Sequence, residues 1–331
     1  MGDKIILGHG SGGRMTRDLV RDLFCRHLAD VAPESMDDGA VLAADGKIVF
    51  TTDSYVVSPL EFPGGDIGTL AVCGTVNDLA VMGARPLWLS LGVILEAGLE
   101  IELLERIVKS IAEKAREAGV KIVCGDTKVV EKGKGDGIFI NTSGIGLLEN
   151  PLHPEAIEPG DKIIVTGTVG DHGMALLTLR KGFPLKSSLK SDCAPLNAML
   201  AQVQEAVELK WMRDATRGGV ATVLNELAEG RSWGVLLQES DLPLSDAVAG
   251  VAELLGLDPL YSANEGKAIL VVAAADAEHA LNLLMKNVYG AGAAIIGTIV
   301  GDFPGKTVLN TEMGTLRTLG ILASDPLPRI C

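Results

Sequence analysis

The chain has 331 residues, and 29 lysines and arginines against 43 aspartates and glutamates give it a formal net charge of −14. This acidic balance argues against a nucleic-acid-binding protein, because affinity for phosphate backbones depends on lysine and arginine. The length permits one or two domains with sizeable cores, and no stretch reaches the roughly 18 uncharged apolar residues of a membrane helix. We therefore expect a cytoplasmic protein that binds neither nucleic acid nor membranes.

Hydrophobic periodicity defines the expected elements in the first half of the chain. We expect helices over residues 16–28, 66–83 and 100–118, and strands over residues 47–53, 86–96, 120–124 and 137–148. Gly119 follows the third helix directly, and glycine is the residue that most often ends a helix. These elements predict a mixed α+β class.

Three prolines, Pro151, Pro154 and Pro159, mark the expected domain boundary. Beyond it we expect strands over residues 162–166, 235–238, 268–273 and 295–300, and helices over residues 173–181, 195–209, 218–229 and 276–287. This alternation predicts an α/β second domain. Past residue 311 the periodicity fades, which predicts a mobile or extended tail that could reach roughly 70 Å. The expected parts are an arm and helix (1–36), a first domain (37–150), a second domain (151–310) and the tail (311–331).

A glycine-rich segment, GHGSGG at residues 8–13, precedes the first helix and fits the G-x-G-x-x-G pattern. A dinucleotide-binding unit would need a second strand ending in an acid after that helix, whereas here the chain continues into VAPESMDDGA. The segment therefore remains either a loop that cradles phosphate or a flexible arm.

Acidic residues recur where strands are expected to stop or turns to begin. They are Asp37, Asp38, Asp53, Asp78, Asp126 and Asp214. Each alone is consistent with a turn or cap residue. As a set they would repel one another unless a cation lay among them, and Mg²⁺ prefers carboxylates, water and nucleotide phosphates. The set therefore predicts a magnesium–nucleotide site without a P-loop.

Three further features carry charge or reactivity. The segment RDATRGG (213–219) precedes a helical pattern, so it could bind an anion at the helix start or simply supply a cap. Lys128 and Glu265 lie in loop-like stretches, where a solvated surface charge is the default interpretation.

Five cysteines without C-x-x-C spacing fit a reducing compartment, and neither a zinc site nor a disulfide framework is expected. Cys331 is the final residue and is expected to be exposed, either as a reactive thiol or as an ordinary tail residue.

Together these motifs resemble the hydrogenase-maturation carbamoyl dehydratase family, HypE. The family belongs to the superfamily of aminoimidazole-ribonucleotide synthetase (PurM), selenophosphate synthetase and thiamine-monophosphate kinase. The superfamily features are GHGSGG, DDGAV (37–41), TTDS (51–54), NDLAVMGARP (77–86), GDTKVV (125–130) and RDATRGG. The family feature is the terminal PRIC (328–331), and the resemblance covers essentially the whole chain.

The resemblance implies a two-domain PurM-like fold whose N-terminal domains pair into a β-barrel, so that the protein is a homodimer with ATP near the dimer interface. It also implies that Cys331 receives a carbamoyl group from a carbamoyltransferase, HypF. ATP-dependent dehydration would then convert the thiocarbamate into a thiocyanate. The cyano group would pass to iron on a HypC–HypD scaffold, as a ligand of the [NiFe] hydrogenase centre.

The resemblance also implies roles for individual residues. Catalysis is assigned to Cys331, to Lys128 as a charge-stabilising group and to Glu265 as the general base. The ATP-binding candidates are Gly10, Ser11, Gly12, Gly13, Asp38, Asp53, Asn77, Asp126, Arg217, Gly218 and Gly219. The Mg²⁺ candidates are the six acids named above.

Two alternatives stay open at this point. One is another ATP-using enzyme of the superfamily, a selenophosphate synthetase or a small-molecule kinase. A selenium donor site would favour a reactive cysteine near the N-terminal glycines, whereas the first cysteine is Cys25, on a helical pattern. The other alternative is a non-catalytic scaffold that only carries a group on its terminal thiol.

Overall fold

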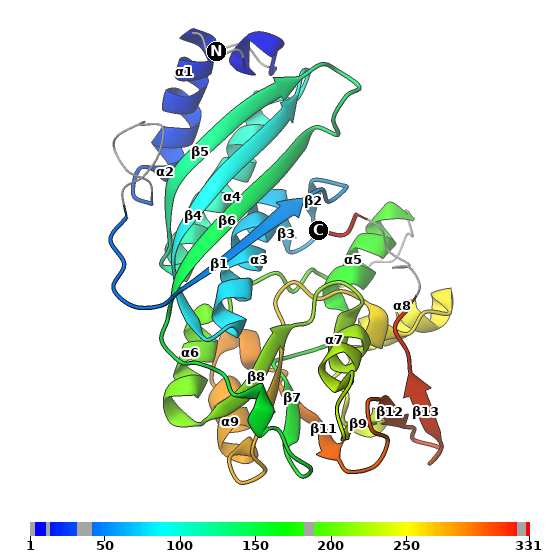
Figure 1. Ribbon diagram of the computed structural model, residues 1–331. Coiled ribbons are helices and arrows are strands. Elements are labelled where there is room, and N and C mark those ends of the chain that lie inside the picture. Colours follow the sequence, from blue (N-terminus) through cyan, green and yellow to red (C-terminus); the bar gives the residue numbers. More distant parts are fainter. Residues whose placement is uncertain (1–3, 11–13, 32–41, 182–188, 323–328) are drawn as a thin grey trace. The chain divides into compact units, whose positions relative to one another are not determined.

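The computed structural model describes residues 4–10, 14–31, 42–181, 189–322 and 329–331 (Figure 1). The chain divides into two compact units. Unit 1 comprises Met1–Leu79, Ala84–Glu149 and Arg329–Cys331, and unit 2 comprises Ala80–Gly83 and Asn150–Pro328. None of the described helices is long and apolar enough to cross a membrane.

Unit 1 is built on a four-stranded sheet with the strand order β1-β6-β4-β5. Its strands are β1 (Ile48–Tyr55), β4 (Ala84–Glu96), β5 (Lys121–Val130) and β6 (Ile138–Leu148), beside a small ribbon of β2 (Glu61–Phe62) and β3 (Gly65–Asp66). Its helical segments are α1 (Arg14–Leu19), the π-helical η2 (Val20–Cys25), α2 (Arg26–Leu28), α3 (Ile67–Val81) and α4 (Ile101–Ala118). Helices α3 and α4 lie on one side of this sheet (Figure 1). Helix α4 buries an apolar stripe that includes Leu104, Ile107 and Ile111, and Gly119 ends it in the left-handed conformation.

Unit 2 contains a seven-stranded sheet with the order β13-β12-β9-β11-β7-β10-β8, in which only β12 and β9 pair in parallel. Its strands are β7 (Lys162–Val165), β8 (Leu209–Asp214), β9 (Gly234–Gln238), β10 (Ala268–Val272), β11 (Ala294–Val300), β12 (Thr307–Asn310) and β13 (Leu316–Leu319). Its helices are α5 (Asp171–Arg180), α6 (Asn197–Ala206), α7 (Gly219–Ala228), α8 (Asp246–Leu255) and α9 (Ala277–Leu284).

Strand β10 shows why both faces of this second sheet are covered. All five of its residues are buried, and alternate side chains enter different cores. Ile269 and Val271 belong to the core that contains residues of α7, whereas Leu270 belongs to the core that contains residues of α6 and α9. Sheets combined with helices in both units confirm the expected mixed, two-domain class.

Three elements differ from the sequence expectations. The helix expected over 195–209 forms but ends at Ala206, and the unanticipated strand β8 follows it because Leu209–Asp214 pairs with β10. Helix α8 was not anticipated. Strand β5 continues to Val130 instead of stopping at residue 124, so Asp126 and Lys128 lie in a strand and not in a turn or loop. Glycine at position 125 permits this continuation, because a Cβ there would lie 2.8 Å from the backbone oxygen of Leu91.

The tail expected from residue 311 onward also begins as ordered structure. Residues Leu316–Leu319 form β13, which pairs antiparallel with β12, and Leu319 is buried. Burial of that leucine against the second core explains why the chain keeps strand structure although its hydrophobic periodicity is weak.

Unit 2 holds a buried ion pair that gives a stability prediction. The Lys210 Nζ lies 2.8 Å from both carboxylate oxygens of Asp161, and the two side chains are 11% and 4% exposed. Lys210→Met leaves that carboxylate buried without its cation, so we expect the free energy of unfolding of unit 2 to fall by about 3–5 kcal/mol. Chemical denaturation followed by the fluorescence of Trp211 and Trp233 measures this change. An unchanged midpoint would contradict it.

Candidate functional site

Strand register separates the candidate residues of unit 1 onto the two faces of its sheet. Asp126 pairs with Gly92, Gly92 with Asn141, and Asn141 with Ser54, so these four positions share one face. Asp53 directly precedes Ser54 and therefore points to the opposite face. The first sheet thus does not bring Asp53 and Asp126 of one chain together.

Asp53 lies on the face that helix α3 covers. Thr51 shares this face, and its hydroxyl donates a 2.8 Å hydrogen bond to the carboxylate of Asp78 on α3. Asn77, the preceding residue of the helix, is 2% exposed. Asp78 lies inside α3, within the helix expected over residues 66–83 and not at a turn, and it lies on the same side of the sheet as Asp53.

The opposite face, called here the outer face, carries Asp126 and Lys128. The Lys128 Nζ donates a 2.5 Å hydrogen bond to Asp126, and both side chains are largely exposed. Asn141 donates to the Ser54 hydroxyl and to the backbone oxygen of Asp53, each at 2.9 Å. The outer face therefore presents an ion pair and a row of hydrogen-bonding groups.

The N-terminal glycine segment contacts strand β5 next to this ion pair. A Cβ at Gly10 would lie 2.4 Å from the backbone nitrogen of Val129, so only glycine allows this approach. His9 is buried, and burial lowers the pKa of its imidazole. Gly10 thus stays a candidate beside Lys128, while Ser11, Gly12 and Gly13 lie outside the described residues.

The expected magnesium site is not assembled by the part of the chain that the structure describes. There, no three histidine, cysteine, aspartate or glutamate side chains are grouped so as to hold a metal ion. Asp37 and Asp38 lie outside the described residues, and Asp214 belongs to unit 2. The six carboxylates remain individual candidates.

The terminal cysteine is buried, which corrects the expectation that it is exposed. Cys331 is only 5% exposed and Ile330 only 3%. The backbone carbonyl of Cys331 accepts a 2.9 Å hydrogen bond from the Val56 N–H, and the Arg329 guanidinium donates to the Val56 carbonyl at 3.0 Å. The end of the chain therefore docks just after strand β1, three residues beyond Asp53. Cys124 on β5, by contrast, is exposed.

A loop between β5 and β6 completes this docking. Arg329 forms an ion pair with Asp136 of that loop. Glu96 shapes the loop by accepting hydrogen bonds from the N–H groups of Gly133, at 2.6 Å, and Gly137, at 3.3 Å. These backbone donors, Gly133 first, lower the pKa of Glu96, so its carboxylate is ionised at neutral pH.

Loss of the Arg329–Asp136 pair gives a second prediction. Asp136→Asn should loosen the docked terminus, and because both side chains are about half exposed the effect should be modest, about two- to fivefold. We expect iodoacetamide to alkylate Cys331 faster by that factor, measured by mass spectrometry of the C-terminal peptide. Glu149→Gln, which breaks the exposed pair with Arg85, is the matched control and should leave the rate unchanged. Equal rates for Asp136→Asn and the unaltered protein would contradict the docking.

In unit 2 the segment RDATRGG makes a glycine turn before helix α7. Gly218 and Gly219 both have positive φ, and a Cβ at Gly219 would lie 2.5 Å from the backbone oxygens of Leu260 and Ser262. No side chain caps the helix, so the alternative that this segment supplies a side-chain cap is wrong. Two glycines at a helix N-terminus remain suited to an anion, and Arg217 beside them is exposed.

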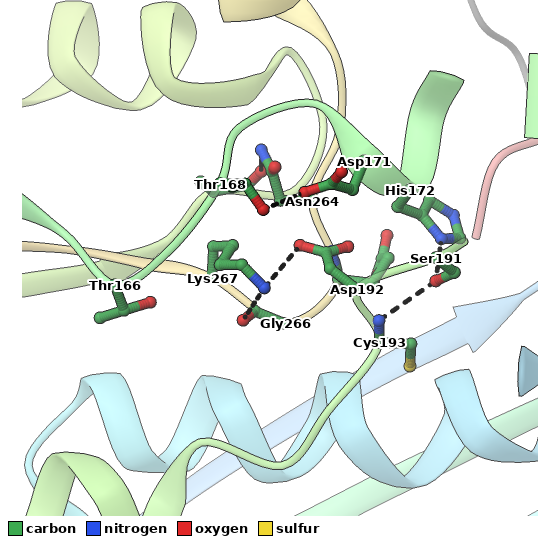
Figure 2. A network of polar contacts seen from close by, with 12 residues as sticks. Thr166, Thr168, Asp171, His172, Ser191, Asp192, Cys193, Asn264, Gly266 and Lys267 are labelled. Carbon is green, nitrogen blue, oxygen red and sulfur yellow. Dashed lines mark hydrogen bonds and ion pairs between the residues drawn. The ribbon is translucent and has the colours of Figure 1, made fainter. Parts of the chain in front are cut away.

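Glu265 is not a solvated surface charge, because it is 3% exposed. Its N–H donates a 3.0 Å hydrogen bond to Asp192 Oδ1, and Asp192 Oδ2 lies 3.3 Å from Lys267 Nζ. Figure 2 shows this ion pair at the centre of a polar network that also contains Asp171, His172 and Asn264.

Sequence reasoning missed several residues that organise the candidate site. They are Asp136, Asp171, Asp192, Asn264 and Lys267. For three of them a local signal existed, since Asn264 and Lys267 lie beside Glu265 in NEGK and Asp136 lies in the glycine-rich turn EKGKGDG (131–137) between β5 and β6. Asp192 carried none, because its partners are distant in sequence.

Comparisons with known proteins agree over nearly the full length. Residues 36–148 match the model of the AIR synthase related protein, N-terminal domain, and residues 158–310 match the C-terminal domain. Carbamoyl dehydratase HypE of Rhodobacter capsulatus is 46% identical, with 99% of this chain and 98% of that protein covered.

Solved structures give the same result. A crystal structure of hydrogenase maturation protein HypE in complex with ATP matches with a TM-score of 0.92 and 43% identity, covering 98% of this chain and 99% of that one. The crystal structure of a HypE–HypF complex matches with a TM-score of 0.79 and 44% identity, covering 94% and 100%. The chain therefore belongs to the HypE family of carbamoyl dehydratases, within the AIR synthase (PurM-like) superfamily.

Proposed function

We propose that this protein uses ATP to dehydrate an S-carbamoyl group on its own Cys331 to an S-cyano group, which becomes a cyanide ligand for the iron of a [NiFe] hydrogenase. The observation that carries the proposal is the terminal cysteine itself, docked beside β1 in a chain 46% identical to a carbamoyl dehydratase. A selenophosphate synthetase or a small-molecule kinase would have no use for a thiol at that place.

The chemistry follows from the poor leaving ability of a carbamoyl oxygen. That oxygen attacks the γ-phosphorus of ATP, ADP leaves, and an imidate phosphate forms on the cysteine sulfur. The carbamoyl nitrogen loses one proton as the imidate forms and its second proton as the carbon–oxygen bond breaks, so that phosphate departs and S–C≡N remains. The carbamoyl oxygen ends in phosphate, and no oxidant or reductant is required.

ATP is the phosphoryl donor in this proposal, in agreement with the ATP complex of the related structure. Gly10 and the glycines at 218 and 219 are suited to phosphate, because their backbones can approach it closely. Lys128 would offset charge that develops during phosphoryl transfer. Asn77, Asp53, Asp126 and Arg217 are the remaining described candidates for ATP contacts.

Magnesium enters the proposal as the partner of ATP. Carboxylate oxygens and phosphates are its preferred ligands, which suits Asp53, Asp78, Asp126 and Asp214 individually. When bound, the ion would neutralise phosphate charge.

Glu265 is the proposed general base. A carboxylate buried at 3% exposure is screened from bulk water, so it can take a proton from the carbamoyl nitrogen without competition from solvent. Exclusion of water also protects the imidate phosphate, because hydrolysis would regenerate the carbamoyl group.

Assembly and delivery belong to the same proposal. The outer face of the first sheet exposes Ile48, Phe50 and Ile94 next to its polar row, which supports pairing of two such sheets in a homodimer. HypF is the proposed carbamoyl donor, in line with the HypE–HypF complex, and a HypC–HypD scaffold is the proposed acceptor of cyanide. The terminus would undock to reach these partners in the cytoplasm.

Phosphate release provides the test of this function. We expect carbamoylated protein to release one phosphate for each cyano group formed in a single turnover, and unmodified protein to release phosphate only at a background rate. ADP formation that requires a small-molecule acceptor and releases no free phosphate would favour the kinase alternative. Cyano formation without phosphate release would overturn the mechanism.

A further inference from the structure

We infer that the buried ion pair between Asp192 and Lys267 is a positioning device for Glu265, and that it balances the charge around this base during dehydration. The inference rests on the proposed role of Glu265. It assigns a function to two residues that the mechanism above does not use.

Both members of the ion pair form hydrogen bonds to the backbone around Glu265, one before and one after its side chain. Asp192 Oδ1 accepts the Glu265 N–H at 3.0 Å, and Lys267 Nζ donates to the Gly266 carbonyl at 3.1 Å. The two charged groups lie 3.3 Å apart and are 4% and 9% exposed (Figure 2). Any rotation of the peptide that carries Glu265 would therefore break a charge-assisted hydrogen bond.

Two glycines permit the close packing that these hydrogen bonds require. A Cβ at Gly266 would lie 1.9 Å from the backbone oxygen of Asp192, so the two segments touch through their backbones. A Cβ at Gly167 would lie 2.6 Å from Lys267 Cε, so the lysine side chain passes directly across that glycine. These close contacts pack the Glu265 segment tightly against the Asp192 backbone and the Lys267 side chain against Gly167.

Further hydrogen bonds hold the residues that neighbour Asp192 and Glu265 in the sequence. Ser191 hydrogen-bonds the ring of His172 at 2.7 Å and accepts the Cys193 N–H at 3.1 Å, which fixes the residues on either side of Asp192. Asn264 accepts the Gly170 N–H at 2.7 Å and donates to the Ala215 carbonyl at 3.0 Å. Glu265 is thus supported by three separate loops.

Stability alone is a weak reason for such a pair. Replacing a buried ion pair by apolar residues is often neutral or stabilising, because desolvation of the charges offsets their attraction. This pair forms hydrogen bonds to the Glu265 N–H and to the Gly266 carbonyl. It therefore fixes the position of Glu265 and balances the local charge, which apolar residues cannot do.

Other titratable groups face the same network. Asp171 and His172 come from α5, and burial raises the pKa of Asp171. Asp171 and Asp192 also border a cavity of about 470 Å³, together with Lys190 and Asp246. The test must therefore separate the effect of the ion pair from a general change in this surrounding charge.

Two substitutions of Asp192 separate the effect of the ion pair from that of the surrounding charge. Asp192→Ala removes both the hydrogen-bond acceptor and the charge, and we expect the single-turnover dehydration rate at saturating ATP to fall by about tenfold or more. Asp192→Asn keeps an oxygen for the Glu265 N–H and should restore most of the rate. It leaves the Lys267 charge unbalanced, which favours ionised Glu265, so the acid limb of the pH–rate profile should move to lower pH.

The double variant Asp192→Asn with Lys267→Met should return the acid limb toward its original position, and ATP affinity should be unchanged in all variants. Asp161→Asn, in the unrelated buried pair with Lys210, is the matched control and should not move the limb. A full rate for Asp192→Ala, or an unmoved acid limb for Asp192→Asn, would overturn the inference. Failure of the proposed role of Glu265 is seen separately, as dehydration that survives Glu265→Gln, and failure of the proposed function is seen as carbamoylated protein that never forms a cyano group with ATP.

Discussion

Cys331→Ala abolishes carbamoylation and cyanation completely in this account while leaving ATP affinity within about twofold of the unaltered protein. The thiol is the only proposed attachment point, so no activity can remain. ATP contacts are assigned to other residues, and calorimetry should therefore give nearly the same dissociation constant. Loss of the Cys331 side chain alone should leave its backbone contact with Val56 available.

Cys25→Ser provides the control for nonspecific thiol chemistry, since Cys25 is half-buried at the end of η2 and has no role in the proposal. It should retain carbamoylation and cyanation. ATP-dependent cyanation of the Cys331→Ala variant at any other residue would remove the basis of the assignment.

Glu265→Gln should slow dehydration by about 10²–10⁴-fold, the usual contribution of a general base, and should leave carbamoylation intact. Glutamine has nearly the same shape as glutamate, and the backbone N–H at this position can still donate to Asp192. The loss of dehydration rate therefore reports the missing base rather than a displaced loop. The expected observation is a carbamoylated C-terminal peptide that persists in the presence of ATP.

Glu253→Gln, an exposed residue of helix α8, is the control for removal of one carboxylate from unit 2. It should dehydrate at the original rate. A Glu265→Gln variant that is as fast as this control would show that another group removes the proton.

The sequence predicted the fold class and most elements because hydrophobic periodicity is a local property. It could not predict which face of a sheet a residue occupies when strand boundaries were wrong. Asp126 was expected at the end of a strand, yet the strand continues through it, and only the register with Gly92 and Asn141 places it opposite to Asp53.

Long-range contacts account for the other gaps. Burial of Cys331 depends on a hydrogen bond to Val56 and an ion pair of Arg329 with Asp136, neither of which has a local signature. The burial of Glu265 likewise depends on Asp192, which comes from a different loop. The motifs therefore indicated the chemistry, whereas tertiary packing decides how each group is held.

Mass spectrometry of the C-terminal peptide tests the central claim most directly. The complete protein would be incubated with the carbamoyl donor system, with and without ATP for the second step, and digested. We predict a carbamoyl mass on Cys331 that is converted to a cyano mass only when ATP is present. A carbamoyl mass that never changes with ATP, or a cyano mass that forms without it, would contradict the account.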